Sequence, residues 1–120
     1  MTLDEYDEYC GSLPGANHVV QWGGSHVWKV GSKLFAVAAP GQDGAGDPAV
    51  TFKASEMSFE MLKDQPGCRP APYLASRGMK WIQRVTGISM DDAALKQYIA
   101  ESHRLAAANL RRAERAAIGI

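Results

Sequence analysis

The chain has 120 residues, and its thirteen basic and thirteen acidic side chains cancel to a formal net charge of zero. This length is typical of a single domain, here residues 1–120, whose core needs no metal or disulfide. Zero net charge argues against a dedicated nucleic-acid or membrane protein, so such binding would require a local patch. The N-terminal sequence MTLDEYDEY lacks the apolar stretch of a signal peptide. We therefore expect a cytoplasmic protein in which Cys10 and Cys68 are free thiols.

The first predicted element is a helix over residues 3–11. Thr2 and Glu5 have the spacing of a capping box, in which each side chain accepts a hydrogen bond from the backbone amide of the other. Acidic side chains crowd the first turns, where the helix dipole favours them. Leu3, Tyr6 and Cys10 form an apolar stripe at helical spacing, which predicts that the helix packs on a core.

Four β-rich segments follow, and they predict strands over residues 18–22, 26–30, 33–39 and 49–53. Gly31-Ser32 is the whole link between the second and third segments. A two-residue link of this kind predicts a tight hairpin with a positive φ at Gly31. The glycine-rich segment 40–48 predicts a loop.

The second half of the chain is predicted to begin with a short helix over residues 56–64, capped by Ser55, with Met57, Met61 and Leu62 on its apolar side. A proline-rich link without regular structure leads to about residue 78, and a strand follows over 80–85. A second capping signal at 89–92 starts a final helix that is predicted to run to about residue 114. Helices at both ends with strands between them predict an α+β fold. We expect a two-layer sandwich in which an antiparallel sheet of about five strands carries both terminal helices on one face.

Several segments, in this order, carry a family resemblance. They are SLPG (12–15), WKVGSKLFAV (28–37), VTFKAS (50–55), PAPYL (70–74) and KWIQ (80–83), followed by the final helix. Together they make the chain, from about residue 3 to 114, resemble the MmcQ/YjbR-like family of small bacterial proteins. The resemblance implies a frataxin-like α/β sandwich. It also suggests DNA binding through two β wings, a role proposed for proteins of this kind.

A basic and aromatic stretch at residues 66–85 is the strongest local charge feature of the chain. It holds four cations and two large aromatic residues, and no acid occurs between Asp64 and Asp91. Cations bind phosphates and aromatic rings stack on bases, so this stretch and the lysines of the other strands predict an anion or nucleic-acid site. The candidate residues are Lys29, Lys33, Lys53, Tyr73, Arg77, Lys80 and Arg84.

A structural interpretation of the same residues stays open. On a strand, Trp81 points away from Lys80 and Arg84, so it can belong to the core while the cations are solvated at the sheet edge. Lys29 and Lys33 flank the predicted turn, where lysines also protect exposed hairpin edges against aggregation.

No catalytic or metal-binding motif occurs in the sequence. The three histidines, His18, His26 and His103, lack ligand spacing, and neither a nucleophile motif nor a phosphate loop is present. We therefore expect a monomeric, non-enzymatic binding module without catalytic residues, metal or cofactor, with weak nucleic-acid contact as its leading function. The alternatives are a protein-interaction module that uses the sheet face around Trp22 and Trp28, a small enzyme, or an iron-binding protein.

Overall fold

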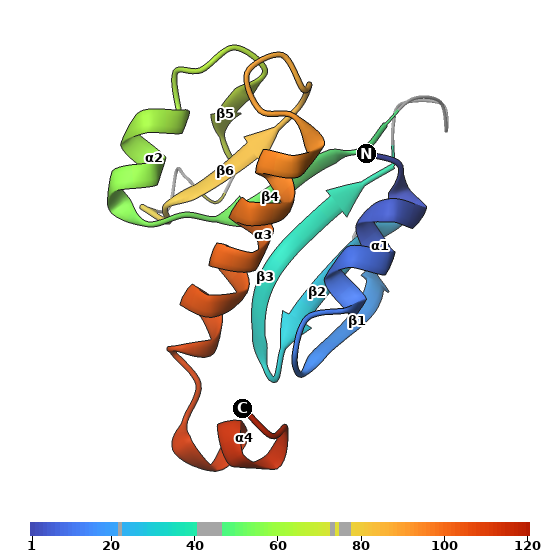
Figure 1. Cartoon of the computed structure of the whole chain (residues 1–120), viewed down its shortest axis with the longest axis vertical. Helices are drawn as coiled ribbons and strands as arrows, with labels where there is room; N and C mark the ends of the chain where they lie inside the picture. Colours follow the sequence, from blue (N-terminus) through green and yellow to red (C-terminus); the bar gives the residue numbers. More distant parts are fainter. Residues whose placement is uncertain (22, 41–46, 73, 75–77) are drawn as a thin grey trace.

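The computed structural model describes residues 1–21, 23–40, 47–72, 74 and 78–120. Its strands are β1 (Ala16–Gln21), β2 (Ser25–Val30), β3 (Lys33–Ala39), β4 (Ala49–Lys53), β5 (Cys68–Pro70) and β6 (Trp81–Arg84). They form one antiparallel sheet in the order β1-β2-β3-β4-β6-β5 (Figure 1). The fold is therefore α+β, as predicted, with six strands in place of the five expected.

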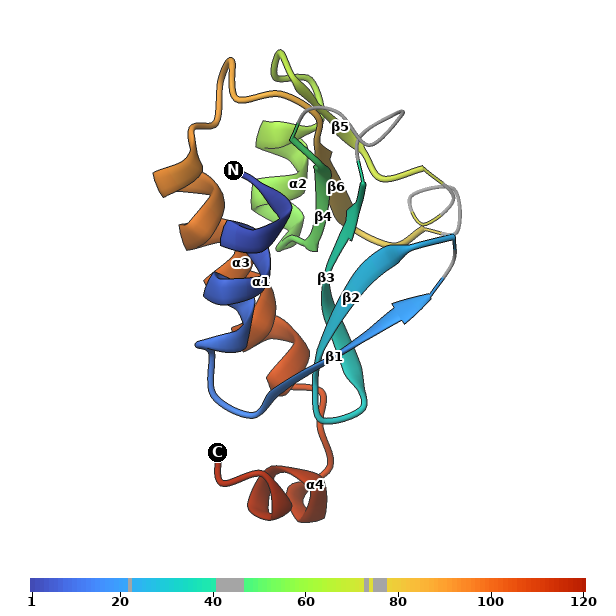
Figure 2. The ribbon, with the colours of Figure 1, turned by 90° about the vertical axis from the view of Figure 1, so that its right-hand side faces the viewer.

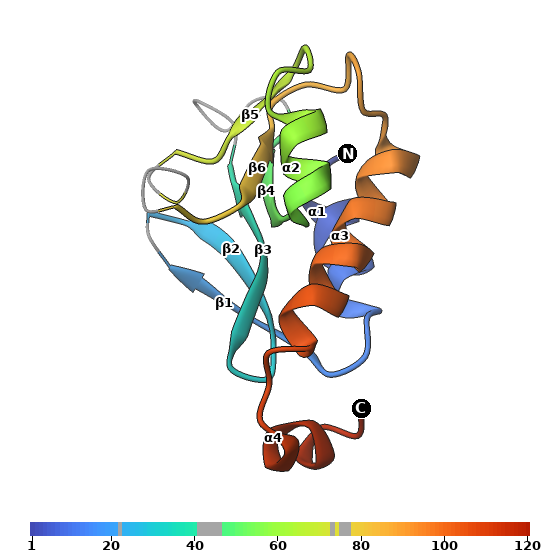
Figure 3. The same cartoon turned by 90° about the vertical axis from the view of Figure 1, so that its left-hand side faces the viewer.

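The helices are α1 (Leu3–Gly11), α2 (Glu56–Leu62), α3 (Asp92–Ala107) and α4 (Arg112–Ala117). The first three lie on one face of the sheet (Figures 2 and 3). The opposite face, which we call the open face, is not covered by any helix of the described residues. Thr2 and Glu5 form the predicted capping box of α1, and Ser55 and Asp91 cap α2 and α3.

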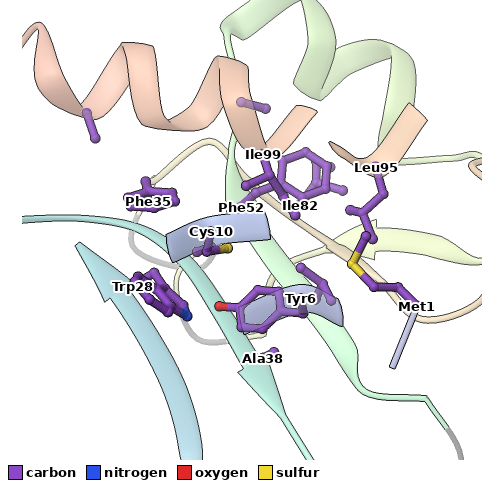
Figure 4. Close-up of a cluster of buried hydrophobic side chains, with 14 of the residues drawn as sticks. Met1, Tyr6, Cys10, Trp28, Phe35, Ala38, Phe52, Ile82, Leu95 and Ile99 are labelled. Carbon is purple, nitrogen blue, oxygen red and sulfur yellow. The ribbon is translucent and has the colours of Figure 1, made fainter. Parts of the chain in front are cut away.

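The core lies between the sheet and these three helices (Figure 4). Its fully buried side chains include Tyr6, Cys10, Phe35, Phe52, Leu95 and Ile99. The apolar stripe predicted for the first helix therefore packs on the sheet, and Leu95 and Ile99 of α3 do the same.

The apolar side of α2 differs from the prediction. Phe59 and Leu62, three positions apart, are buried, whereas Met57 and Met61 are 76% and 55% exposed. A helix of seven residues presents only one narrow side to the sheet, so the side that carries the two methionines faces solvent.

Three predicted boundaries are also corrected. The strand expected at 18–22 is β1, which starts at Ala16, and residue 22 lies outside the described residues. The proline-rich link contains β5, whose three residues pair with β6. Proline is tolerated there because β5 is an edge strand. The final helix is divided, since α3 ends at Ala107 and Leu110 is buried against the β2–β3 turn instead of extending the stripe of α3.

The predicted hairpin turn is confirmed at Gly31-Ser32. Val30 pairs with Lys33 across it, and Gly31 has a φ of 57°. The link to α4 packs against this turn, because a Cβ on Gly31 would lie 3.1 Å from Leu110 Cδ2.

We expect Gly31→Val to lower the free energy of unfolding by about 1 kcal/mol or more, because a β-branched residue is strained at a positive φ. Urea denaturation of the variant and the parent measures the difference. Gly31→Asn is the matched control, since asparagine tolerates a left-handed backbone and should cost less than valine. A valine variant as stable as the parent would show that the turn does not require glycine.

Candidate functional site

Strand register defines which side chains reach the open face. Successive residues of a strand point to opposite faces, and Phe52 of β4 belongs to the core, so Thr51 and Lys53 point to the open face. Their partners in β6 follow, because Thr51 pairs with Gln83 and Lys53 pairs with Trp81. The open face can therefore be described strand by strand.

The open face holds a groove of about 800 Å³. Its apolar lining comes from Leu34, Val37, Ala39, Ala49, Pro72 and Leu74. Its polar lining includes Thr51, Arg69 and Gln83. Ser25 of β2 also lines the groove, so most of the lining is apolar and a few polar groups accompany it.

A single row of cross-strand neighbours crosses the whole open face. From β1 to β5 it consists of Val19, Val27, Val37, Thr51, Gln83 and Arg69. The last four members line the groove. The row is apolar over β1, β2 and β3, and it ends in a hydroxyl, an amide and a guanidinium.

The charge on the open face is positive. Arg69 Nε donates a hydrogen bond to Gln83 Oε1 at 2.7 Å, which orients the guanidinium. Lys29 and Lys53 point to the same face. Among the described strand residues that point to this face, none is acidic. The groove therefore lies in a field that attracts anions.

The structure separates the lysines that were predicted to bind anions. Lys29 and Lys53 lie on the open face, whereas Lys33 is exposed at the β2–β3 turn. Lys80 precedes β6, and its Nζ lies 4.9 Å from the centre of the Phe59 ring of α2. These four lysines therefore do not form one site.

Arg84 forms an internal ion pair on the face that the helices cover. It is 8% exposed, and its Nη2 lies 3.0 Å from Asp92 Oδ1. Asp92 also accepts a hydrogen bond from the amino group of Met1 at 3.0 Å. The amino group first, and Arg84 second, lower the pKa of Asp92. The prediction that Arg84 is solvated at a sheet edge is wrong, because β5 extends the sheet beyond β6.

Trp81 is buried, as the structural interpretation predicted. It is 4% exposed although its strand position points to the open face. Tyr73 and Arg77 lie outside the described residues. The described part of the basic stretch therefore offers no exposed ring for stacking on bases.

Trp28, which the protein-interaction alternative places on its binding face, is buried beneath α1. It is 7% exposed, and its Nε1 donates a hydrogen bond to Asp7 Oδ1 at 2.9 Å. Asp7 Oδ2 lies 2.7 Å from His26 Nδ1, so one carboxylate joins α1 to two residues of β2. Trp28 therefore offers little surface to a partner, and Trp22 lies outside the described residues.

A second positive surface, which we call the basic end, consists of Lys33, Arg111, Arg112 and Arg115. All four side chains belong to exposed residues, and none forms an ion pair with a described residue. Figure 1 shows α4 beside the β2–β3 turn, at one end of the molecule. The three arginines were not predicted as site residues, because one continuous helix would not place them at this turn.

Neither cysteine is activated as a nucleophile. Cys10 and Cys68 are free, and burial raises the pKa of both thiols. Among the described residues, no group of three or more histidine, cysteine or acidic side chains is placed to hold a metal ion. No helix in the described part of the chain is long and apolar enough to cross a membrane.

A family model described as YjbR matches residues 11–105, and the chain belongs to this family. The resemblance drawn from the sequence is thereby confirmed. The structure is similar to protein DR2400 of Deinococcus radiodurans, a DUF419 domain, with a TM-score of 0.81 and 20% identity over 99% of this chain and 88% of that one. A protein from Pseudomonas syringae gives a TM-score of 0.68 and 17% identity over 88% of this chain and 99% of that one. No curated protein matches the chain. At these identities the two structures show a shared fold alone.

Proposed function

We propose that the domain is a binding module that contacts nucleic acid weakly through its basic end. The observation that supports this function is the contact between Glu114 and Ser32. Glu114 Oε2 accepts hydrogen bonds from Ser32 Oγ at 2.8 Å and from Ser32 N at 3.3 Å. This contact holds α4 against the β2–β3 turn, so that Lys33 and the three arginines share one surface.

The four cations of the basic end are available to bind phosphates. None of them has to leave an ion pair with a described residue before it contacts a phosphate. Arginine also presents a planar fork of donors that matches phosphate oxygens. Leu110, which is 7% exposed, anchors the segment that carries the arginines.

The same geometry limits the strength of binding. Glu114 stands among the arginines, and Figure 1 places the carboxyl terminus of the chain at the same end, so the net positive charge is smaller than the number of cations. Only a few phosphates can be engaged at once. The zero net charge of the chain adds no long-range attraction.

We expect a short fluorescein-labelled DNA duplex to bind with micromolar or weaker affinity. The logarithm of the binding constant should fall with the logarithm of salt concentration at a slope of about −0.9 per phosphate engaged. In the double variant Arg111→Gln/Arg112→Gln, binding should weaken for all DNA sequences, and the slope should flatten by about 1 for each phosphate that the variant no longer engages. Fluorescence anisotropy over a salt series measures both quantities.

The matched control is Lys63→Gln/Lys96→Gln, which removes the same charge from helices far from the basic end. It should bind DNA nearly as the parent does. Equal weakening of binding in both double variants would show that only net charge matters, and absence of binding at low salt would end the nucleic-acid proposal.

A further inference from the structure

The groove on the open face has the size of a small-molecule site. Its volume of about 800 Å³ falls within the range of roughly 300–1,000 Å³ that is typical of such sites. Such sites also combine a mainly apolar lining with a few polar groups that fix the orientation of the ligand. The groove has a lining of this composition.

The polar groups of the groove are available to a ligand. Thr51 is only 7% exposed, and its hydroxyl makes no hydrogen bond to a described residue. The hydroxyl is not among the described buried polar atoms that lack a partner, so it keeps contact with solvent, and a ligand atom can bond it in place of water. Gln83 accepts a hydrogen bond from Nε of Arg69 alone, and the two Nη atoms of Arg69 make no hydrogen bond to a described residue. The guanidinium is therefore oriented and still open to an anion.

Spacing along the row limits the length of the ligand. Neighbouring strands lie about 4.8 Å apart, so the three strand spacings from Val37 to Arg69 cover about 14 Å. A medium-length acyl chain or a small aromatic body with a carboxylate at one end spans this distance.

We propose that the groove binds a small amphipathic carboxylate, with its anionic head at Arg69 and its apolar body over Val37 and Leu34. An anionic ligand is complementary in charge to the open face. Lys29 and Lys53 add positive charge to this face, and no described strand residue on it is acidic. The proposal is independent of nucleic-acid binding at the basic end, since the two surfaces share no residue.

The chemistry of the lining favours a carboxylate with an apolar body over a nucleic-acid strand. Phosphates and sugars would lie on the apolar side chains of Leu34, Val37 and Ala49 without hydrogen bonds. Bases would also need exposed rings, and the only described aromatic side chain of the basic stretch, Trp81, is buried.

Titration of the full chain with decanoate, below its micelle concentration, tests the proposal. Calorimetry should show saturable binding, and the backbone amide signals of Val37, Thr51 and Gln83 should shift in nitrogen–proton correlation spectra. Affinity should rise from hexanoate through octanoate to decanoate by up to about fourfold for each added methylene.

The variant Arg69→Met retains an apolar stem and removes the guanidinium. Its affinity for decanoate should fall by about tenfold or more, whereas its affinity for decanol should stay that of the parent. Lys63→Met, which removes one positive charge on the side of the helices, should bind decanoate as the parent does. Thermal melts verify that both variants are folded, which we expect because both residues are at the surface.

Four outcomes would overturn the proposal. Three are no saturable decanoate binding to the folded parent, equal decanoate affinities of Arg69→Met and Lys63→Met, and amide shifts confined to the basic end. The fourth is displacement of decanoate by single-stranded DNA, which would assign the groove to nucleic acid.

Discussion

Replacing Trp81 by alanine should lower the free energy of unfolding by about 3–5 kcal/mol, the range for truncation of a large buried aromatic side chain. Trp81 is 4% exposed, and it pairs with Lys53 in the ladder between β4 and β6. Its carbonyl oxygen accepts a hydrogen bond from Ala71 N at 2.9 Å, so the segment after β5 is tied to the same residue. Loss of the indole should therefore loosen this side of the sheet. Urea denaturation followed by circular dichroism measures the change.

Met79→Ala is a suitable control, because Met79 lies two positions before Trp81 and is 40% exposed. It should change the free energy of unfolding by no more than about 0.5 kcal/mol. At temperatures where Trp81→Ala is folded, it should bind duplex DNA as the parent does, since Trp81 is not part of the basic end. If Trp81→Ala instead keeps full stability and loses DNA binding, Trp81 is a stacking platform and its assignment to the core is wrong.

The parts of the fold that could be predicted depend on neighbouring residues. The capping box of Thr2 and Glu5 involves residues three positions apart, and the turn at Gly31-Ser32 needs only its own two residues and the flanking strands. Such local chemistry is fully contained in a short window of sequence. Such local signals are enough to predict the order of helices and strands along the chain.

The parts that could not be predicted depend on contacts between distant segments. A strand of three residues, such as β5, has no visible alternation, and its identity comes from pairing with β6. Leu110 fits the apolar stripe of a continuous helix as well as it fits the observed break. Only the position of the β2–β3 turn, against which Leu110 packs, decides between the two.

The same reason explains the errors at the candidate sites. Whether a cation is free depends on its partners, and Arg84 is withdrawn from the surface by Asp92. The row from Val19 to Arg69 takes one residue from each of six strands, so no sequence window contains it. The alternation of AVTFK at residues 49–53 is a local signal that could have indicated that Thr51 and Lys53 share the open face.

Replacing Ser102 by alanine should lower the free energy of unfolding by roughly 2–5 kcal/mol, because two backbone groups lose their partner and each such loss costs about 1–3 kcal/mol. Phe35 is unpaired in the register of β2 with β3, since Trp28 pairs with Ala36 and Lys29 with Leu34. The fully buried hydroxyl of Ser102 donates a hydrogen bond to Phe35 O at 2.6 Å and accepts one from Lys53 N at 2.8 Å. One side chain of α3 thus bridges the backbones of β3 and β4 beside Ala36 and Phe52, the last pair of their ladder.

Ser58→Ala is the matched control, because the hydroxyl of Ser58 makes no hydrogen bond to a described residue and its removal should change stability little. Chemical denaturation compares the two variants, and amide hydrogen exchange gives a local readout, since the Lys53 amide should exchange faster only in Ser102→Ala. Full stability of Ser102→Ala with unchanged protection at Lys53 would mean that another group satisfies these atoms. The side chain of Lys53 points to the open face, so the hydrogen bond that Lys53 N donates to Ser102 Oγ also holds in place the residue that carries a cation beside the groove. Decanoate should accordingly bind less tightly to Ser102→Ala than to Ser58→Ala under conditions where both are folded.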